Sequence, residues 1–157
     1  MRFLKTGAAA LLGAALGIAT PMVAKHEGVS LTPYDDAVGV RTVCYGSTSP
    51  SETSYTHTLD ECTALLNKQL RGYSQAVLEA TGPSISVQEL AAYTSFSYNV
   101  GTGAFKNSTL LKKFKAGDRE GACNELPRWN KAGGKVLNGL VTRRAEEQKL
   151  CLSGVHK

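Results

Sequence analysis

Residues 6–24, TGAAALLGAALGIATPMVA, form an uncharged stretch of 19 residues directly after Arg2 and Lys5. As a helix with a rise of 1.5 Å per residue, this stretch is about 28 Å long, close to the thickness of the hydrocarbon core of a bilayer. Three interpretations are open. The stretch is a signal peptide cleaved at a small residue near Ala19 or Ala24, an ordinary buried helix, or a membrane span that can leave the bilayer.

The composition of this stretch favours the third interpretation. Ten of its residues are Gly or Ala, and its bulky apolar residues are Leu11, Leu12, Leu16, Ile18, Met22 and Val23. Only the bulky residues contribute much to membrane insertion, a few tenths of a kcal/mol each, so the span is long enough to insert but weakly held. Basic residues before the span predict that the N-terminus stays in the cytoplasm and the rest of the chain is exported.

Export bears on the four cysteines, because an exported chain meets an oxidising compartment that favours disulfides. No CxxC motif occurs, and the three histidines are not spaced as zinc ligands with the cysteines, so no metal site is predicted. We favour the pairs Cys44–Cys62 and Cys123–Cys151, since each links neighbouring elements, but three connectivities are possible.

The rest of the chain suits one domain that is α+β but mostly helical. A β-branched stretch at 38–45 predicts a small hairpin or sheet. Capping boxes at 58–61 and 86–89 predict helices that run to about residue 79 and to the glycines at 101 and 103. Short helices near 108–116 and 118–126 and a last helix near 139–152 are expected. The net charge of +5 is scattered rather than clustered, which argues against a nucleic-acid partner.

Acidic residues follow shortly after the uncharged stretch in the sequence. Glu27 precedes Gly28, which predicts that Glu27 lies at a helix end, and Asp36 and Thr42 are expected on either side of the hairpin's first strand. A helix end that faces a hairpin can place two carboxyls and a hydroxyl around one cleft. Splitting a glycosidic bond needs a proton donor for the leaving oxygen and a second group that stabilises positive charge or activates water. A Glu and an Asp at this spacing also occur by chance as surface groups, so spacing alone is weak support.

Sequence motifs extend this pattern. HEG-x5-YDD-x5-TVCYG resembles the Glu-x8-Asp-x5-Thr motif of the phage lysozyme family of endolysins. SFSYNVGTGAFKNSTLLKKFKAGD, residues 95–118, resembles the long central helix and Gly-rich turn of that family. RWNKAGGKVLNGLVTRRAEE, residues 128–147, resembles its C-terminal helical region. The resemblance covers about residues 20–152 and implies a lysozyme-like fold, with a small N-terminal hairpin region and a helical C-terminal lobe.

The resemblance also implies roles for single residues. Glu27 is the expected proton donor, Asp36 stabilises the developing oxocarbenium charge or helps to position water, and Thr42 holds the water. Asp35 is expected to be a solvated neighbour. Asn99 is expected either to bind substrate or to make a simple helix-end hydrogen bond. The family needs no metal or organic cofactor, and its substrate is peptidoglycan, cleaved between N-acetylmuramic acid and N-acetylglucosamine.

The uncharged stretch resembles the anchor of a subgroup, the signal-arrest-release (SAR) endolysins. This likeness implies an anchor at 1–24 and a catalytic domain at 25–157, whose catalytic helix begins near residue 18 after release. The expected location is the inner membrane facing the periplasm, followed by the periplasm itself, and a monomer is expected. No cysteine lies within residues 1–43, which excludes activation by exchange with an anchor thiol.

Two other functions are open. A lytic transglycosylase would need the glutamate but not the pair of Asp36 and Thr42. A membrane-tethered wall-binding protein would need none of them for catalysis.

Arg143 and Arg144 are expected to anchor acidic partners within the fold rather than to touch substrate.

Overall fold

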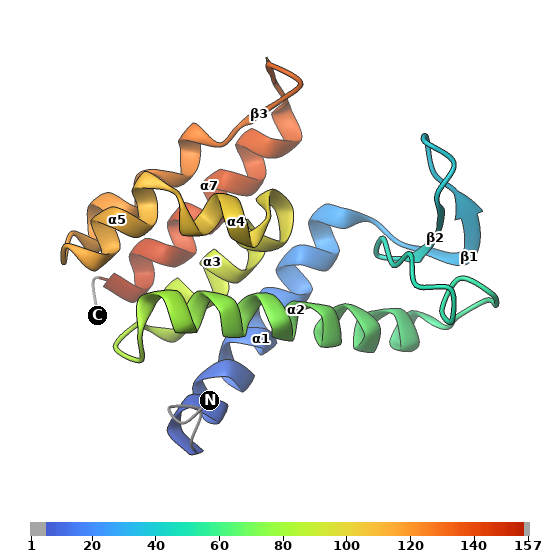
Figure 1. Cartoon of the computed structure of the whole chain (residues 1–157), viewed down its shortest axis with the longest axis horizontal. Helices are drawn as coiled ribbons and strands as arrows, with labels where there is room; N and C mark the ends of the chain where they lie inside the picture. The colour runs from blue at the N-terminus through green and yellow to red at the C-terminus, as the bar shows by residue number, and fades with distance from the viewer. Residues whose placement is uncertain (1–5, 156–157) are drawn as a thin grey trace.

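The computed structural model describes residues 6–155 as a helical body from which a small hairpin projects (Figure 1). Arg2 and Lys5, on which the predicted membrane orientation depends, lie outside the described residues. The elements in chain order are α1 (Thr6–Glu27), β1 (Ser30–Asp35), β2 (Arg41–Cys44), α2 (Leu59–Thr81), α3 (Val87–Val100), α4 (Thr102–Lys106), α5 (Thr109–Lys115), α6 (Arg119–Cys123), the 3₁₀ helix η1 (Leu126–Arg128), β3 (Lys131–Ala132), β4 (Lys135–Val136) and α7 (Asn138–Val155). The α+β, mostly helical fold class is therefore confirmed.

Helix α1 is long and apolar enough to cross a membrane by length and composition, yet here it packs against α2 and α3. Its buried residues recur every three or four positions along one face: Ala8, Leu12, Ala15, Leu16, Ala19, Thr20 and Val23. This is the spacing of one face of an α-helix. The opposite face is made of small residues, with exposed Gly and Ala at positions 7, 9, 10, 13, 14 and 17. The two faces of α1 therefore differ in residue size: its bulky apolar side chains are buried or half-buried, whereas Gly and Ala make up most of its exposed face.

The apolar face of α1 joins two clusters of buried side chains. One cluster includes Leu12 and Ala19 together with residues of α2, α3, α5, α6 and α7. The other includes Leu16 and Val23 together with residues of β2 and the first half of α2. One helix thus connects the helical body with the hairpin. Because burial of apolar side chains is the main stabilising contribution to folding, we infer that the body depends on this helix.

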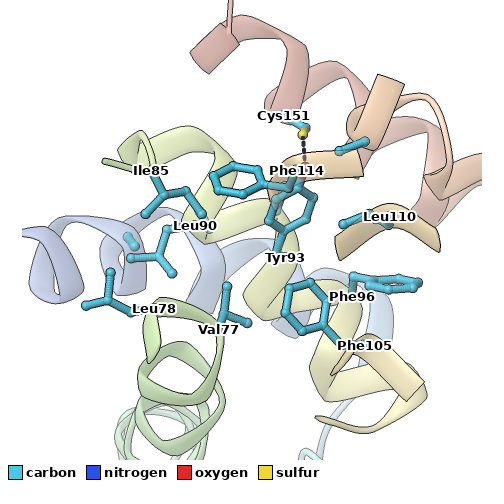
Figure 2. Close-up of a cluster of buried hydrophobic side chains, with 14 of the residues drawn as sticks. Val77, Leu78, Ile85, Leu90, Tyr93, Phe96, Phe105, Leu110, Phe114 and Cys151 are labelled. Atoms are coloured by element: carbon cyan, nitrogen blue, oxygen red, sulfur yellow. Dashed lines mark hydrogen bonds between the residues drawn. The ribbon is translucent and has the colours of Figure 1, made fainter. Parts of the chain in front are cut away.

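Helix α3 lies at the centre of the body, and every residue from Glu89 to Ser97 is buried. Figure 2 shows the aromatic part of this core, in which Tyr93 lies among Phe105, Phe114 and Leu90. The hydroxyl of Tyr93 donates to Sγ of Cys151 at 3.2 Å, and burial raises the pKa of this phenol. A buried hydroxyl without a partner is costly, so this bond satisfies the one polar group of Tyr93.

Both predicted capping boxes are present. The backbone N–H of Glu61 donates to Thr58 Oγ1 at 3.1 Å, and the N–H of Thr58 donates to the Glu61 carboxylate at 2.7 Å. Ser86 and Glu89 make the same reciprocal pair at the start of α3. Such pairs satisfy backbone donors that have no partner within the helix.

The predicted hairpin exists, but its strands are placed differently from the expectation. The strand expected at 38–45 is the shorter β2, and it pairs with β1, which was not expected to be a strand. Asp36 therefore lies in the turn between the strands and Thr42 on the second strand, rather than on either side of the first. The β1 segment contains Pro33, which lacks a backbone donor, and Pro is tolerated in a strand at the edge of a sheet.

A second difference lies at β3 and β4, within the region expected to be helical. The two short strands pair antiparallel around Gly133 and Gly134, whose φ angles are 57° and 79°. A two-residue hairpin turn of this kind needs positive φ at both central residues, which two glycines allow without strain. The expected helix at 118–126 is also shorter, because α6 ends at Cys123 and η1 follows.

The cysteines pair as Cys44–Cys62 and Cys123–Cys151, the pairing that we favoured from the sequence. The first disulfide joins β2 to α2, and the second joins α6 to α7. Cys44 has a φ of 61°, which is rare for a residue with a side chain. Two backbone hydrogen bonds between Val43 and Ser47, at 2.9 and 2.8 Å, close the tight turn around it.

Candidate active site

Glu27 is the last residue of α1, as predicted. Gly28 follows with a φ of 72°, and its N–H donates to the carbonyl of Ala24 at 3.4 Å. Glycine adopts this left-handed conformation at no steric cost, which explains why the helix ends here. The helix therefore carries the Glu27 carboxyl to the point where the body meets the hairpin.

The Glu27 carboxylate is paired with Arg143 of α7. Nη1 of Arg143 donates to Oε2 of Glu27 at 2.6 Å, and the two residues are 116 positions apart in the sequence. The side chain of Arg143 is 5% exposed, whereas that of Glu27 is 26% exposed. The carboxyl is thus held from the protein side and remains accessible from the solvent side. The predicted anchoring role of Arg143 is present, and its partner includes the candidate acid itself.

Glu27 lines two neighbouring cavities. One has a volume of about 350 Å³ and is bordered by Glu27, His26, Asn99, Arg143 and residues at the start of α7. The other has a volume of about 240 Å³ and is bordered by Glu27 to Ser30, Tyr34 and Cys44 to Gly46. Gly46 also borders a third cavity of about 480 Å³ on the α2 side of the hairpin. The three cavities therefore adjoin one another, and Glu27 lies between the first and the second.

Asp36 is fixed by its own turn. Its Oδ1 accepts the backbone N–H groups of Val38 at 2.9 Å and Val40 at 2.8 Å. These bonds use one oxygen of the carboxylate and close the hairpin turn. Within residues 6–155, no hydrogen bond or ion pair joins Asp36 or Thr42 to Glu27.

Thr42 is buried on β2, and its hydroxyl donates to the carbonyl of Val40 at 2.9 Å. Neither Thr42 nor Asp36 borders the two cavities that Glu27 lines. The structure thus places both residues on the hairpin that follows Glu27, with side chains engaged in local hydrogen bonds.

Asn99 lies near the end of α3 and borders the same cavity as Glu27 and Arg143. Its neighbour Tyr98 donates its hydroxyl to the carbonyl of Tyr45 at 3.3 Å, which ties α3 to the turn after β2. Burial, followed by the negative charge of Glu27, raises the pKa of Tyr98 to about 12. Tyr98 therefore stays protonated and electrically neutral beside the carboxyl.

Sequence reasoning missed the surroundings of Glu27. Arg143 and Arg144 were expected to be anchors, but the pair of Arg143 with Glu27 joins α7 to α1, which lies far away in the chain. Arg144 pairs with Glu147 within α7 itself. No sequence pattern indicated the residues Ser47, Thr48 and Tyr73, which border the third cavity. Among the side chains of the described part of the chain, no group of three or more His, Cys, Asp or Glu could hold a metal ion.

Comparison with known proteins places this geometry in a family. Residues 24–147 match the family described as Phage lysozyme. The SAR-endolysin of Enterobacteria phage PA-2 is 43% identical over 157 residues, which cover 96% of this chain and 95% of the relative.

Two solved structures have a similar fold. The muramidase domain of SpmX from Asticaccaulis excentricus has a TM-score of 0.77 at 25% identity, covering 85% of this chain and 94% of that one. The active form of the P1 phage endolysin Lyz has a TM-score of 0.78 over 94% of each chain, but at 22% identity it shows the fold alone. The predicted family and fold are confirmed: the chain belongs to the phage lysozyme family and is a lysozyme-type glycoside hydrolase.

Proposed function

We propose that this enzyme cleaves the β-1,4 bond between N-acetylmuramic acid and N-acetylglucosamine in peptidoglycan, and so lyses the host cell when phage are released. Glu27 is the proton donor to the glycosidic oxygen. The observation that carries the proposal is the position of this carboxyl, which ends α1, borders two cavities and is held by Arg143. General acid catalysis needs a proton donor at such a solvent-accessible, fixed position.

Asp36 and Thr42 complete the chemistry in this proposal. Asp36 stabilises the positive charge that develops at the sugar carbon or helps to position water, and Thr42 holds that water. The two backbone hydrogen bonds to Oδ1 of Asp36 support this role, because they fix the carboxylate in one orientation. A fixed charge needs no reorganisation at the moment of reaction.

The glycan chain occupies the cavities on either side of Glu27. The cavity beyond Gly46 is bordered by the hydroxyl-bearing residues Thr48 and Ser49 and by the aromatic residues Tyr73 and Tyr98. Hydroxyls and aromatic faces suit sugar rings, which present both hydrogen-bonding groups and apolar faces. On the other side Asn99 offers an amide to the substrate. The proposed reaction needs no metal or organic cofactor, and the enzyme acts as a monomer with no nucleic-acid partner.

Residues 1–24 serve as a transient anchor in the inner membrane, from which the enzyme is released into the periplasm. The support is that α1 satisfies the length and composition of a membrane span while its bulky residues form the apolar face that packs on α2 and α3. That face cannot contact lipid and the protein core at the same time. The tethered enzyme is therefore inactive, because Glu27 at the end of α1 is not in its place, and release activates it.

Two rival functions differ in their products. A lytic transglycosylase leaves an anhydro end on the muramic acid, whereas a hydrolase leaves a reducing end. A non-catalytic wall-binding protein releases no fragments at all.

The test is digestion of purified peptidoglycan by the wild type and by Glu27→Gln, with mass spectrometry of the fragments. We expect reducing-end fragments from the wild type and a loss of rate of at least about a hundredfold in Glu27→Gln, because the amide has no acidic proton to transfer to the glycosidic oxygen. The matched control is Glu52→Gln, which removes a half-buried glutamate outside the Glu27 cavities. Anhydro ends, or full activity in Glu27→Gln, would contradict the proposal.

A further inference from the structure

Behind Glu27 lies a cluster of charged groups between α3 and α7, which we call the buried ion cluster: Arg143, Arg144 and Glu147, with the hydroxyl of Ser95. The side chains of Arg144 and Glu147 are fully buried, and Arg143 is nearly so. Such groups are rarely buried unless they are paired, because removal of a charge from water is costly. The described structure thus keeps three charges inside the core, next to the residue that we propose as the acid.

Each member of the cluster has defined partners. Nε of Arg144 lies 2.7 Å from Oε1 of Glu147, and Ser95 Oγ donates to Oε2 of Glu147 at 2.6 Å. Nε of Arg143 lies 3.5 Å from Oε2 of Glu147 as an ion pair without a hydrogen bond, and its Nη2 donates to the carbonyl of Ser95 at 3.3 Å. Its Nη1 donates to Glu27. Together with Glu27, the cluster contains two guanidiniums and two carboxyls. The guanidinium of Arg143 is the link, since one side of it faces Glu147 and the other side faces Glu27.

Other elements contribute few charges near Glu27. Its own helix contributes His26 and Lys25, which pair with Glu146. Helix α3 contributes the phenol of Tyr98, and the hairpin contributes the phenol of Tyr34, which borders the same cavity. Asp36, in the hairpin turn, makes no contact with Glu27 among the described residues. Arg143 is therefore the cation in direct contact with the Glu27 carboxyl.

We propose that Glu147 is a positioning residue of the hydrolysis reaction: it fixes the guanidinium of Arg143 from the core side and shares its charge, so that Glu27 can keep the proton that it must donate. This inference rests on the proposed role of Glu27 as the acid. Glu147 does not touch substrate, because its side chain has no solvent exposure. It acts through Arg143.

Charge balance around the Arg143 guanidinium gives the physical reason for this role. A guanidinium at 2.6 Å favours the ionised form of a carboxyl, which is the wrong form for a proton donor. A second carboxylate on the same guanidinium weakens that preference, since part of the positive charge is already compensated. Burial raises the pKa of Glu147 above its usual value, and Arg144, the Ser95 hydrogen bond and Arg143 oppose only part of this rise. Two guanidiniums face this carboxyl, at 2.7 and 3.5 Å, and this pairing favours the ionised form that Glu147 needs in order to share Arg143.

The test is the pH dependence of kcat for Glu147→Gln, which keeps the shape of the side chain and removes its charge. Without Glu147, Arg143 acts on Glu27 alone, and Glu27 loses its proton at lower pH. We expect the alkaline limb of the profile to move down by about one pH unit, with a loss of about tenfold in kcat on that limb and little change in KM.

Two further variants separate positioning from folding. Glu125→Gln also removes a buried carboxylate with two basic partners, Lys113 and Arg128, but it has no contact with Arg143. It should lower the melting temperature without moving the pH profile. Glu147→Asp keeps the charge and should return the alkaline limb toward the wild-type position, and Ser95→Ala should move it in the same direction as Glu147→Gln but less.

The outcomes are distinct. A wild-type pH profile in a folded Glu147→Gln, or an equal shift in Glu125→Gln, overturns the inference while the function of Glu27 stands. If Glu147→Gln does not fold, the profiles of Ser95→Ala and Glu147→Asp decide, and an unchanged limb in Ser95→Ala overturns the inference. Full activity of Glu27→Gln, in contrast, overturns the proposed function itself.

Discussion

Glu27 and Asp36 lie nine residues apart in the sequence, but the protein holds them in different ways. Glu27 is held by Arg143, a residue from the far end of the chain that is itself fixed by the buried ion cluster. Asp36 is held by the backbone of its own turn, through Val38 and Val40. The hairpin around Asp36 is largely exposed, with Val38 and Tyr34 open to solvent.

The two carboxyls therefore depend on different parts of the structure for their positions. The position of Glu27 depends on the packing of α1, α3 and α7, so whatever weakens the core should displace the proposed acid. The position of Asp36 depends on local hydrogen bonds. It should therefore stay the same when the core is changed, and shift only when the hairpin itself is altered. Variants in the two regions can therefore be matched and compared.

The largest effect is expected for Arg144→Met, which leaves the buried carboxylate of Glu147 without its closest cation. Loss of one partner from a buried pair costs about 3 to 5 kcal/mol of the free energy of unfolding. The hairpin counterpart is Arg41→Met, whose pair with Asp35 spans 3.5 Å with both side chains more than half exposed, and it should cost less than about 1 kcal/mol. Urea denaturation of both variants measures the contrast, and similar losses would contradict it.

Removal of the disulfides should have the second largest effect on the free energy of unfolding. Loops of 18 and 28 residues predict a loss of about 3 kcal/mol for each pair on the loop-entropy argument. Cys123→Ala with Cys151→Ala should lower the melting temperature and leave the activity of the folded fraction close to that of the wild type. Cys44→Ala with Cys62→Ala should also lower activity, because that disulfide fastens β2 to α2 beside the cavity of Glu27. Calorimetry and peptidoglycan digestion at 25 °C measure both, and an equal loss of activity would remove the distinction.

Asp36→Asn should have a smaller effect on free energy but a clear one on catalysis. The amide oxygen can still accept the N–H groups of Val38 and Val40, so the turn is kept and only the charge is lost. We expect a loss in kcat of about a hundredfold with a nearly unchanged melting temperature. Asp35→Asn is the control, since this exposed neighbour should keep most of the activity. If the two variants behave alike, Asp36 has no special role.

The smallest effect is expected at the outer contact between α1 and α7. Lys25 donates to the Glu146 carboxylate at 2.9 Å, and this hydrogen bond is the main cause that holds the pKa of Glu146 below its usual value. A carboxyl with a lowered folded pKa stabilises the protein above its unfolded pKa, and this stabilisation is lost as the pH falls through the folded value. Lys25→Met should therefore cost less than about 1 kcal/mol near pH 7 and less still at low pH. Thermal denaturation at several pH values tests this, and a cost that grows as the pH falls would contradict it.

Local chemistry made part of the fold predictable from the sequence. The capping boxes at Thr58 and Ser86 and the glycine after Glu27 act within one turn of the backbone, and the structure contains all three. The strand limits were wrong where a local rule was outweighed or overlooked. Strand β1 was not predicted because it contains Pro33, a residue that is unfavourable in most strands. The hairpin turn at Gly133 and Gly134 was overlooked because it lies within a region expected to be helical.

The candidate site was predictable only in part. The helix end at Glu27 follows from Gly28, but Arg143 is 116 residues away, and no local pattern indicates which carboxyl it will contact. The spacing of Arg143, Arg144 and Glu147 places them on one side of a helix, yet their partner Ser95 comes from the packing of α3 on α7. Contacts that join distant segments are fixed by tertiary packing, which residue spacing does not encode.

One measurement tests the central claim, that the apolar stretch becomes the packed helix that carries the proposed acid. Cells that express the full chain are fractionated before and after depolarisation of the inner membrane, and the soluble protein is analysed by intact mass and by peptidoglycan digestion. We predict that the active soluble enzyme appears after depolarisation and retains the residues of α1. An active soluble enzyme that begins at Thr20 or Lys25 would contradict the claim, because the buried face of α1 would then be dispensable.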